Sequence, residues 1–180
     1  MTLRIDKYMT KLPVTLYTVL TVFCLLILSC KEKQIPDLYV PDDFEVTVVI
    51  DSINGGARHI AVRDNGDIYV KLKTPKRGGN VALRDKNGDG RIDTMAVFGG
   101  YTEQGNYGTA MRIYNGYLYF STELDVYRMK LDPTSLVPSG HLDTILADDH
   151  AHGSHEHIGK PVTFDDSGHI FVPFGAPSNT

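Results

Sequence analysis

The chain of 180 residues contains no tryptophan, and its two cysteines, Cys24 and Cys30, both lie near the N-terminus. The rest of the chain therefore has no disulfide, no cysteine-ligated zinc site and no catalytic thiol. Basic residues are scarce as well. Residues 1–29 hold three of the 18 lysines and arginines and one of the 22 acids, which leaves 15 basic against 21 acidic residues. This acidic balance argues against nucleic-acid binding, which needs a basic surface.

The N-terminus has the pattern of a secretory signal. Val14–Leu28 is an uncharged stretch that follows basic residues, and it is shorter than the roughly 20 residues of a membrane-spanning helix. It ends in Ile27–Cys30, which resembles the lipobox of bacterial lipoproteins. We expect residues 1–29 to be a signal peptide with a helical core, and Cys30 to carry the lipid that anchors the protein in the cell envelope. An uncleaved anchor helix is the alternative.

Residues 30–43 contain two prolines and several charges, which is typical of an extended tether. Beyond this tether no helical periodicity appears. A short motif instead recurs: a turn pair with glycine, followed by an aliphatic–aromatic–apolar strand. It occurs three times, about 50 residues apart, and an apolar strand precedes each copy. The copies are Asn65–Val70, Asn115–Phe120 and Ser167–Val172.

A hairpin that recurs with a period near 50 is the signature of a β-propeller, in which each blade has four strands. Short strands between the hairpins, such as 95–98 and 125–128, bring the count to about four per repeat. We therefore predict an all-β fold, with residues 44–180 forming about two and a half blades. Since propellers close with roughly 4–8 blades, we expect the chain to be the N-terminal part of a longer protein. Hairpins of a β-sandwich that resemble one another by chance are the alternative.

An acidic loop follows the first hairpin. Its sequence, D-K-N-G-D-G-R-I-D, matches the start of a calcium loop, in which oxygen ligands at alternate positions point at one cation. The twelfth position is Ala96 rather than glutamate, so an EF-hand is not expected. The same residues also favour plain turns, and the two readings remain open. The candidate calcium ligands are the side chains of Asp85, Asn87, Asp89 and Asp93 and the carbonyl of Arg91.

Four of the seven histidines fall between His150 and His157, after two aspartates. Such a loop either chelates a transition metal or is simply a polar surface loop. His157 lies eight residues before the turn Asp165–Gly168, just ahead of the third hairpin. That position is where loops of a propeller gather around its central channel.

The segment His157–Gly175 resembles the part of the glucose/sorbosone dehydrogenases that carries their catalytic histidine, and the acidic loop is similar to a turn of the sorbosone dehydrogenase-like branch. The resemblance covers about residues 44–180. It implies a six-bladed propeller that binds pyrroloquinoline quinone (PQQ), often with calcium, and oxidises sugars or sugar aldehydes. It also implies that His157 is the catalytic base, that Glu156 supports it in place of an aspartate, and that Gln104 lies at the quinone.

The expected function is therefore hydride transfer from a sugar-type substrate to PQQ in the longer protein, with the 180-residue chain inactive alone. Two other functions fit the same residues. A propeller of the cell surface that binds glycan or protein without catalysis is one, and metal capture by the histidine loop is the other.

Overall fold

The computed structural model describes residues 38–73, 79–100, 108–148 and 159–174, and all their regular structure is β-strand. The signal segment 1–29 and Cys30 lie outside the described residues. Ten strands follow one another within these described ranges: β1 Ala57–Val62, β2 Ile68–Leu72, β3 Asn80–Arg84, β4 Thr94–Phe98, β5 Met111–Tyr114, β6 Tyr117–Ser121, β7 Asp125–Lys130, β8 Ser139–Ala147, β9 Thr163–Phe164 and β10 Ile170–Phe171.

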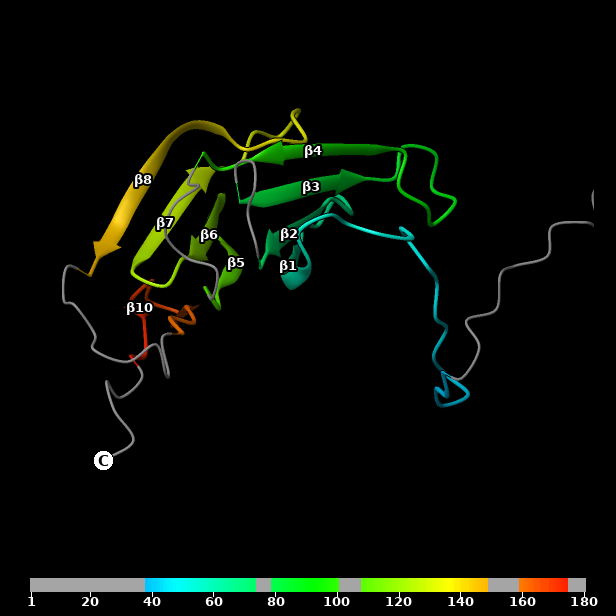
Figure 1. The fold of residues 1–180 in the computed structure, drawn as a ribbon, viewed down its shortest axis with the longest axis horizontal. Coiled ribbons are helices and arrows are strands. Elements are labelled where there is room, and N and C mark those ends of the chain that lie inside the picture. The colour runs from blue at the N-terminus through cyan, green and yellow to red at the C-terminus, as the bar shows by residue number, and fades with distance from the viewer. Residues whose placement is uncertain (1–37, 74–78, 101–107, 149–158, 175–180) are drawn as a thin grey trace, which may run out of the picture. The chain divides into compact units, whose positions relative to one another are not determined.

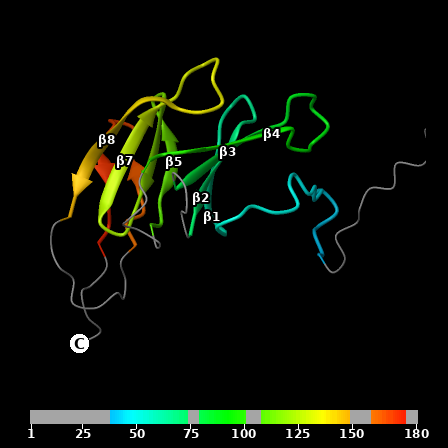
Figure 2. The same cartoon turned by 45° about the horizontal axis from the view of Figure 1, so that its top comes forward.

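The strands form two four-stranded antiparallel meanders and one hairpin (Figures 1 and 2). The first sheet has the order β1-β2-β3-β4, the second sheet has the order β5-β6-β7-β8, and β9 pairs with β10. This is the predicted arrangement of four strands per repeat, followed by the first hairpin of a third repeat. The all-β class is confirmed for the part of the chain that the structure describes.

The β5–β6 turn shows why this sequence forms a hairpin. Asn115 and Gly116 have φ angles of 45° and 77°, so both central residues are in the left-handed region. A two-residue turn of this kind matches the right-handed twist of the strands, and asparagine followed by glycine adopts it at the lowest cost. The register follows from the turn, with Tyr114 opposite Tyr117 and Ile113 opposite Leu118.

Successive residues of each strand lie on opposite faces of the first sheet. Tyr69 and Ala82 lie opposite each other on what we call the back face, whereas Val70 and Val81 lie opposite each other on the front face. The back face packs against the second sheet in one buried cluster. Within this cluster the rings of Tyr69 and Phe98 meet edge to face, with 5.9 Å between their centroids. The members of the cluster from the second sheet are Met111, Leu118, Phe120 and Met129, with Leu131 beyond β7.

The second sheet repeats this arrangement toward the third hairpin. Its other face contains Ala110, Tyr119 and Val126, and it packs against Val162 and Phe164. The rings of Tyr114 and Phe164 are stacked, with centroids 4.1 Å apart and planes 3° from parallel. Each repeat therefore packs face to face on the next, as blades of a propeller do.

A buried ion pair ties the β1–β2 turn to the first sheet. The side chain of Asp67 is 1% exposed, and Arg84 donates two hydrogen bonds to it, from Nε at 2.6 Å and from Nη2 at 2.7 Å. Burial acts to raise the pKa of Asp67, but hydrogen bonds from Arg84 and Asn65, with the Arg84 charge, hold it below its usual value. This pair is structural, because the geometry is bidentate and the carboxylate is shielded from solvent, while the Arg84 side chain is 27% exposed.

By compactness the chain divides into Met1–Val46 and Thr47–Thr180. In the first unit the described residues 38–46 contain a single turn, in which the backbone N–H of Phe44 donates to the carbonyl of Pro41. Nowhere in the described ranges does the structure contain a helix that is long and apolar enough to cross a membrane.

Candidate functional site

The connections between strands lie at two opposite ends of the sheets, which we call the turn end and the loop end. In an antiparallel meander alternate connections share an end. The β1–β2 and β3–β4 connections are therefore at the turn end, and the β2–β3 connection and the segment after β4 are at the loop end. The second sheet follows the same rule, with its β6–β7 connection at the loop end.

Hydrogen bonds between the sheets bring equivalent ends together. At the turn end Arg63 Nη1 donates to the carbonyl of Asp132 over 2.9 Å. At the loop end Arg58 Nε donates to the carbonyl of Gly108 over 3.2 Å. The loop ends of both sheets therefore lie next to each other.

The residues that flank the histidine segment are anchored at the loop end. Lys160 Nζ lies 3.0 Å from Asp148 Oδ2, and these side chains are only 3% and 5% exposed. Lys160 also donates to the carbonyl of Glu123 in the β6–β7 connection, over 2.8 Å. A buried ion pair thus joins the two sides of residues 149–158. His157 and Glu156 belong to that segment and lie outside the described residues.

Gln104 also lies outside the described residues, and the residues that follow it are at the loop end. The backbone N–H groups of Thr109 and Ala110 both donate to Ser121 Oγ, over 3.1 and 3.0 Å. A Cβ on Gly108 would overlap the carbonyl oxygen of Ser121, so only glycine allows this approach. The segments that contain Gln104 and His157 are therefore both attached to the sheets at the loop end.

A cationic group that sequence reasoning missed lies at the same end. The side chain of Lys71 is fully buried on the back face of β2, and desolvation together with the nearby charge of Arg58 lowers its pKa to about 8. Its cross-strand neighbour His59 has a lowered pKa as well, first through burial and then through the charges of Arg58 and Lys71. The signal in the sequence was a single charge inside the apolar run Ile68–Leu72.

The acidic loop lies at the opposite end, because it joins β3 to β4 at the turn end. Asp85 accepts hydrogen bonds from the backbone N–H groups of Asn87, Gly88 and Gly90, over 2.7 to 3.0 Å. Partial desolvation acts to raise the pKa of Asp85, but these donors hold it below its ordinary value. The structure therefore brings the predicted ligands together in one turn, and it separates them from the anchors of the histidine segment.

The other predicted ligands are also hydrogen-bonded within the loop. Asn87 Oδ1 accepts from the N–H of Asp89, Asp89 Oδ1 accepts from the N–H of Arg91, and Asp93 Oδ2 accepts from the N–H of Lys86. Among the described residues, no three His, Asp, Glu or Cys side chains converge as a metal cluster does.

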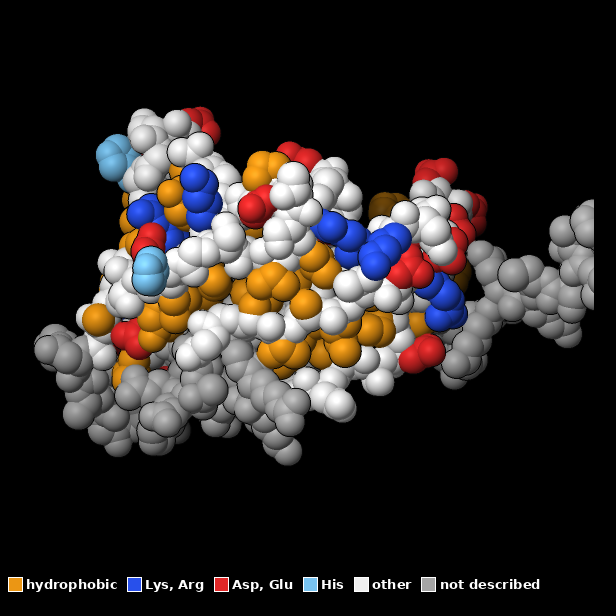
Figure 3. Space-filling model, turned by 90° about the horizontal axis from the view of Figure 1, so that it is seen from above, with side chains coloured by type: hydrophobic (Ala, Val, Ile, Leu, Met, Phe, Trp, Pro, Cys, Tyr) orange, Lys and Arg blue, Asp and Glu red, His pale blue; other side chains and the backbone are white. Residues whose placement is uncertain are grey.

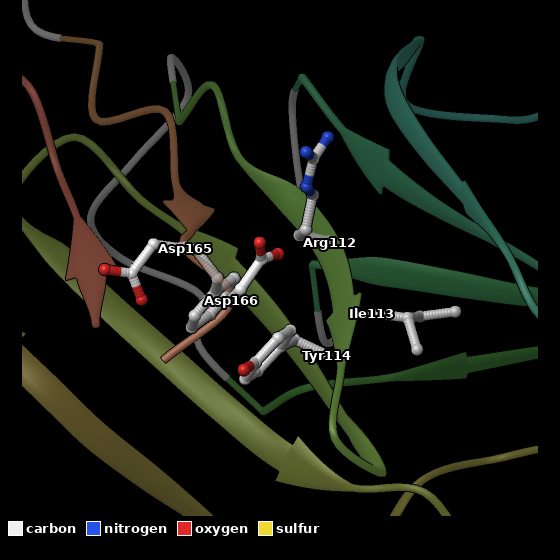
Figure 4. Close-up of a pocket in the computed structure, with 6 residues that line it drawn as sticks. Arg112, Ile113, Tyr114, Asp165 and Asp166 are labelled. Atoms are coloured by element: carbon white, nitrogen blue, oxygen red, sulfur yellow. The ribbon is translucent and has the colours of Figure 1, made fainter. Parts of the chain in front are cut away.

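A pocket with a volume of about 550 Å³ opens between the second sheet and the third hairpin (Figure 4). Arg112 and Tyr114 approach it from β5, and two carboxylates approach it from the β9–β10 turn. One of these carboxylates, Asp165, has its Oδ2 2.7 Å from Nδ1 of His169, and this hydrogen bond is the first cause that lowers the pKa of Asp165. The lining is thus aromatic and charged, with both signs of charge. Its residues are Arg112, Ile113, Tyr114, Phe164, Asp165 and Asp166.

Three comparisons place this arrangement among known proteins. No family model matches the chain, and no curated protein matches it. Solved structures do match. The holo form of the PQQ domain of pyranose dehydrogenase from Coprinopsis cinerea has a TM-score of 0.58 at 15% identity, over 73% of this chain and 30% of that one.

A calcium structure of a Trichoderma reesei protein of Carbohydrate-Active Enzymes family AA12 has a TM-score of 0.56 at 17% identity, over 73% of this chain and 32% of that one. The chain thus spans about 30% of the length of the structures it resembles. Likeness at this identity shows the fold, and it confirms the prediction of a partial β-propeller.

Proposed function

We propose that the chain is the N-terminal part of a PQQ-dependent oxidoreductase that acts on a sugar or a sugar aldehyde. The observation that carries the proposal is the likeness of the fold to a PQQ domain and to a family AA12 protein. The similarity of His157–Gly175 to the glucose/sorbosone dehydrogenases supports the same chemistry.

The loop end offers charges that suit this cofactor. PQQ is an anion with several carboxylate groups, and carboxylates pair best with guanidinium and ammonium groups. Arg58 is exposed at the start of β1, and Lys71 is buried beside it with a charge that burial disfavours. An anion bound here would stabilise the protonated form of Lys71. Arg58 is thus the described residue best suited to contact the cofactor, with Lys71 contributing its charge from behind, together with Gln104 by resemblance.

The proposed roles at the reacting centre belong to His157 and Glu156. The imidazole of His157 accepts the proton of the substrate hydroxyl, a role that suits histidine because an unperturbed imidazole has a pKa near neutral pH. Glu156 orients the ring and stabilises its cation. The bound quinone supplies the two-electron acceptor. The buried pair of Lys160 and Asp148 tethers both sides of the segment that holds the base.

The test is PQQ-dependent oxidation of sugars by the product of the complete reading frame, with a dye as the final acceptor. His157→Ala should lower the rate by about 10²–10⁴-fold, whereas His150→Ala should change it little. The isolated 180-residue chain should be inactive. Failure of PQQ to bind the complete product, or equal loss from both substitutions, would refute this assignment.

We also propose that the acidic loop binds calcium, weakly. All its candidate ligands are oxygens, which calcium prefers. Asp85 already accepts backbone hydrogen bonds from Asn87, Gly88 and Gly90, so a cation would compete with these donors for its oxygens, which keeps the binding weak. Ala96 stands where a bidentate glutamate would strengthen binding. Calorimetry with calcium chloride should give a dissociation constant above about 1 μM that Asp85→Asn weakens further.

The proposed location is the cell envelope, through a lipid on Cys30. Membrane anchoring of this kind takes two or more acyl chains. Cys30→Ser should release the protein from membranes or block its processing. Unchanged membrane retention of that variant would reject the anchor.

A second candidate function is glycan binding without catalysis, and the pocket in Figure 4 favours it. Aromatic and charged side chains around a pocket of this size suit a polyhydroxylated ligand. If glycan binding persists in the complete product when PQQ does not bind, and Arg112→Ala removes it, this second function holds.

A further inference from the structure

Four asparagines of the chain are followed directly by glycine: Asn54, Asn65, Asn87 and Asn115. Such pairs are chemically labile, because the backbone nitrogen of the next residue can attack the side-chain amide, and glycine has no side chain to obstruct the approach. All four asparagines are exposed. Access to solvent therefore does not distinguish them, and their hydrogen bonds decide which of them react.

Two of these pairs are locked by an aspartate that lies two residues after the asparagine. Nδ2 of Asn65 donates to Oδ2 of Asp67 over 2.9 Å, and Oδ1 of Asn65 accepts from the N–H of Asp67 over 3.1 Å. Asn87 and Asp89 form the same two hydrogen bonds, over 3.1 and 2.9 Å. Both side chains are thereby held in a conformation that the reaction has to break.

The attacking nitrogens of the two locked pairs are hydrogen-bonded as well. The N–H of Gly66 donates to the carbonyl of Arg63 over 2.8 Å, and the N–H of Gly88 donates to Oδ1 of Asp85 over 2.7 Å. Each of these bonds must break before the nitrogen can turn toward the side-chain carbon. Three hydrogen bonds therefore oppose the reaction at each locked pair.

The hairpin of the second repeat has an Asn–Gly pair at the equivalent position without the lock. Asn115 is equivalent to Asn65, but the residue two positions on is Tyr117, which has no carboxylate. Among the described residues, neither the side chain of Asn115 nor the N–H of Gly116 has a hydrogen-bond partner. Asn54 has no aspartate two residues on either, so it belongs with Asn115.

We propose that Asn115 is a site of spontaneous deamidation in the folded protein. The backbone nitrogen of Gly116 bonds to Cγ of Asn115, its proton passes through water to Nδ2, the bond from Cγ to Nδ2 breaks, and ammonia leaves. A second water then opens the cyclic imide at either carbonyl. One product is aspartate, and the other is isoaspartate, in which the main chain runs through the side-chain carbons. The reaction needs no oxidant, and the proposal does not depend on the quinone chemistry.

The isoaspartate linkage alters the molecule more than the added charge does. Figure 3 shows carboxylates at several places on one face of the molecule, so one more at an exposed turn is a small change. The extra main-chain carbon, in contrast, does not fit a two-residue turn, and the register of Tyr114 opposite Tyr117 depends on that turn. Because Tyr114 stacks on Phe164 and lines the pocket of Figure 4, the modification should also disturb the pocket.

The test is peptide mapping of the folded protein after timed incubation in mildly alkaline buffer with a calcium chelator. Mass spectrometry measures the conversion of amide to acid at each pair, and an isoaspartate methyltransferase labels the isoaspartate. One hydrogen bond has a net worth of about fivefold in an equilibrium constant, and three must break at each locked pair, so Asn115 should react at least about tenfold faster than Asn65 and Asn87. In concentrated urea the pairs should react at similar rates.

A pair of variants in the acidic loop tests the lock itself. Asp89→Ala removes the acceptor for Nδ2 of Asn87 and should speed the reaction at Asn87 about fivefold. Lys86→Ala, which changes another exposed side chain of the same loop, should leave that rate unchanged. Three results would overturn the proposal: Asn65 or Asn87 reacts as fast as Asn115 in the folded protein, the order of rates persists in urea, or Asp89→Ala has no effect on Asn87.

Discussion

Replacing Lys71 with methionine should stabilise the protein at neutral pH, although it removes a charged group from the fold. The ammonium of Lys71 is fully buried, and its pKa is lowered to about 8 from the ordinary value of 10.5. A difference of roughly 2.5 pKa units corresponds to about 3 kcal/mol, since each unit is worth 1.36 kcal/mol. This is the upper limit of the penalty that the folded protein carries when Lys71 is protonated.

The sign of the pH dependence follows from proton binding. Between pH 8 and 10.5 the unfolded chain holds the Lys71 proton and the folded chain has largely lost it, so this residue makes stability rise with pH. Below pH 8 both states are protonated and the full penalty applies. Lys71→Met should therefore raise the free energy of unfolding at pH 7 by about 1–3 kcal/mol, the lower value allowing for lost contacts of the amine.

Urea unfolding of the 180-residue chain at pH 7, 8.5 and 10 measures this effect. The advantage of Lys71→Met over the wild type should shrink as the pH rises, whereas Lys73→Met, which changes an exposed lysine, should show no such trend. NMR titration should also show a higher pKa for His59 in the Lys71 variant, because one of the charges that lower it is gone. Parallel stability curves for wild type and variant across this range would refute the reasoning.

Three further substitutions test the packing of the sheets by urea unfolding at pH 7. Arg84→Met leaves Asp67 buried without its bidentate partner and should cost about 3–5 kcal/mol, while the Arg84→Met, Asp67→Asn double variant should recover part of that loss. Lys160→Met leaves the buried carboxylate of Asp148 without its partner, so it should lower the free energy of unfolding by a similar amount and speed hydrogen exchange in the β6–β7 connection. Unchanged exchange would contradict the anchoring role of the Lys160–Asp148 ion pair. Gly108→Ala should cost at least about 1–3 kcal/mol through overpacking, and a neutral result would show that the segment before β5 can move aside.

The strands and their pairing are properties that the sequence determined by itself. Alternating apolar residues around Asn65-Gly66 and Asn115-Gly116 place hairpins at 57–72 and 111–121, because turn geometry and strand period are local. The period near 50 extended this local pattern to four strands per repeat. It could do so because each repeat is one supersecondary unit with the same requirements. The turn of the acidic loop could be predicted for the same reason, because it depends on residues that are neighbours in the sequence.

Other features depended on which faces meet in space. The sequence could not show that Lys71 is buried beside Arg58, because that contact arises when the first sheet packs against the second. The same holds for Lys160 and Asp148, which are twelve residues apart and meet only on the β6–β7 connection. Tertiary structure also decided that the acidic loop and the anchors of the histidine segment lie at opposite ends. Strand polarity sets that separation, and it requires the full order of the sheet.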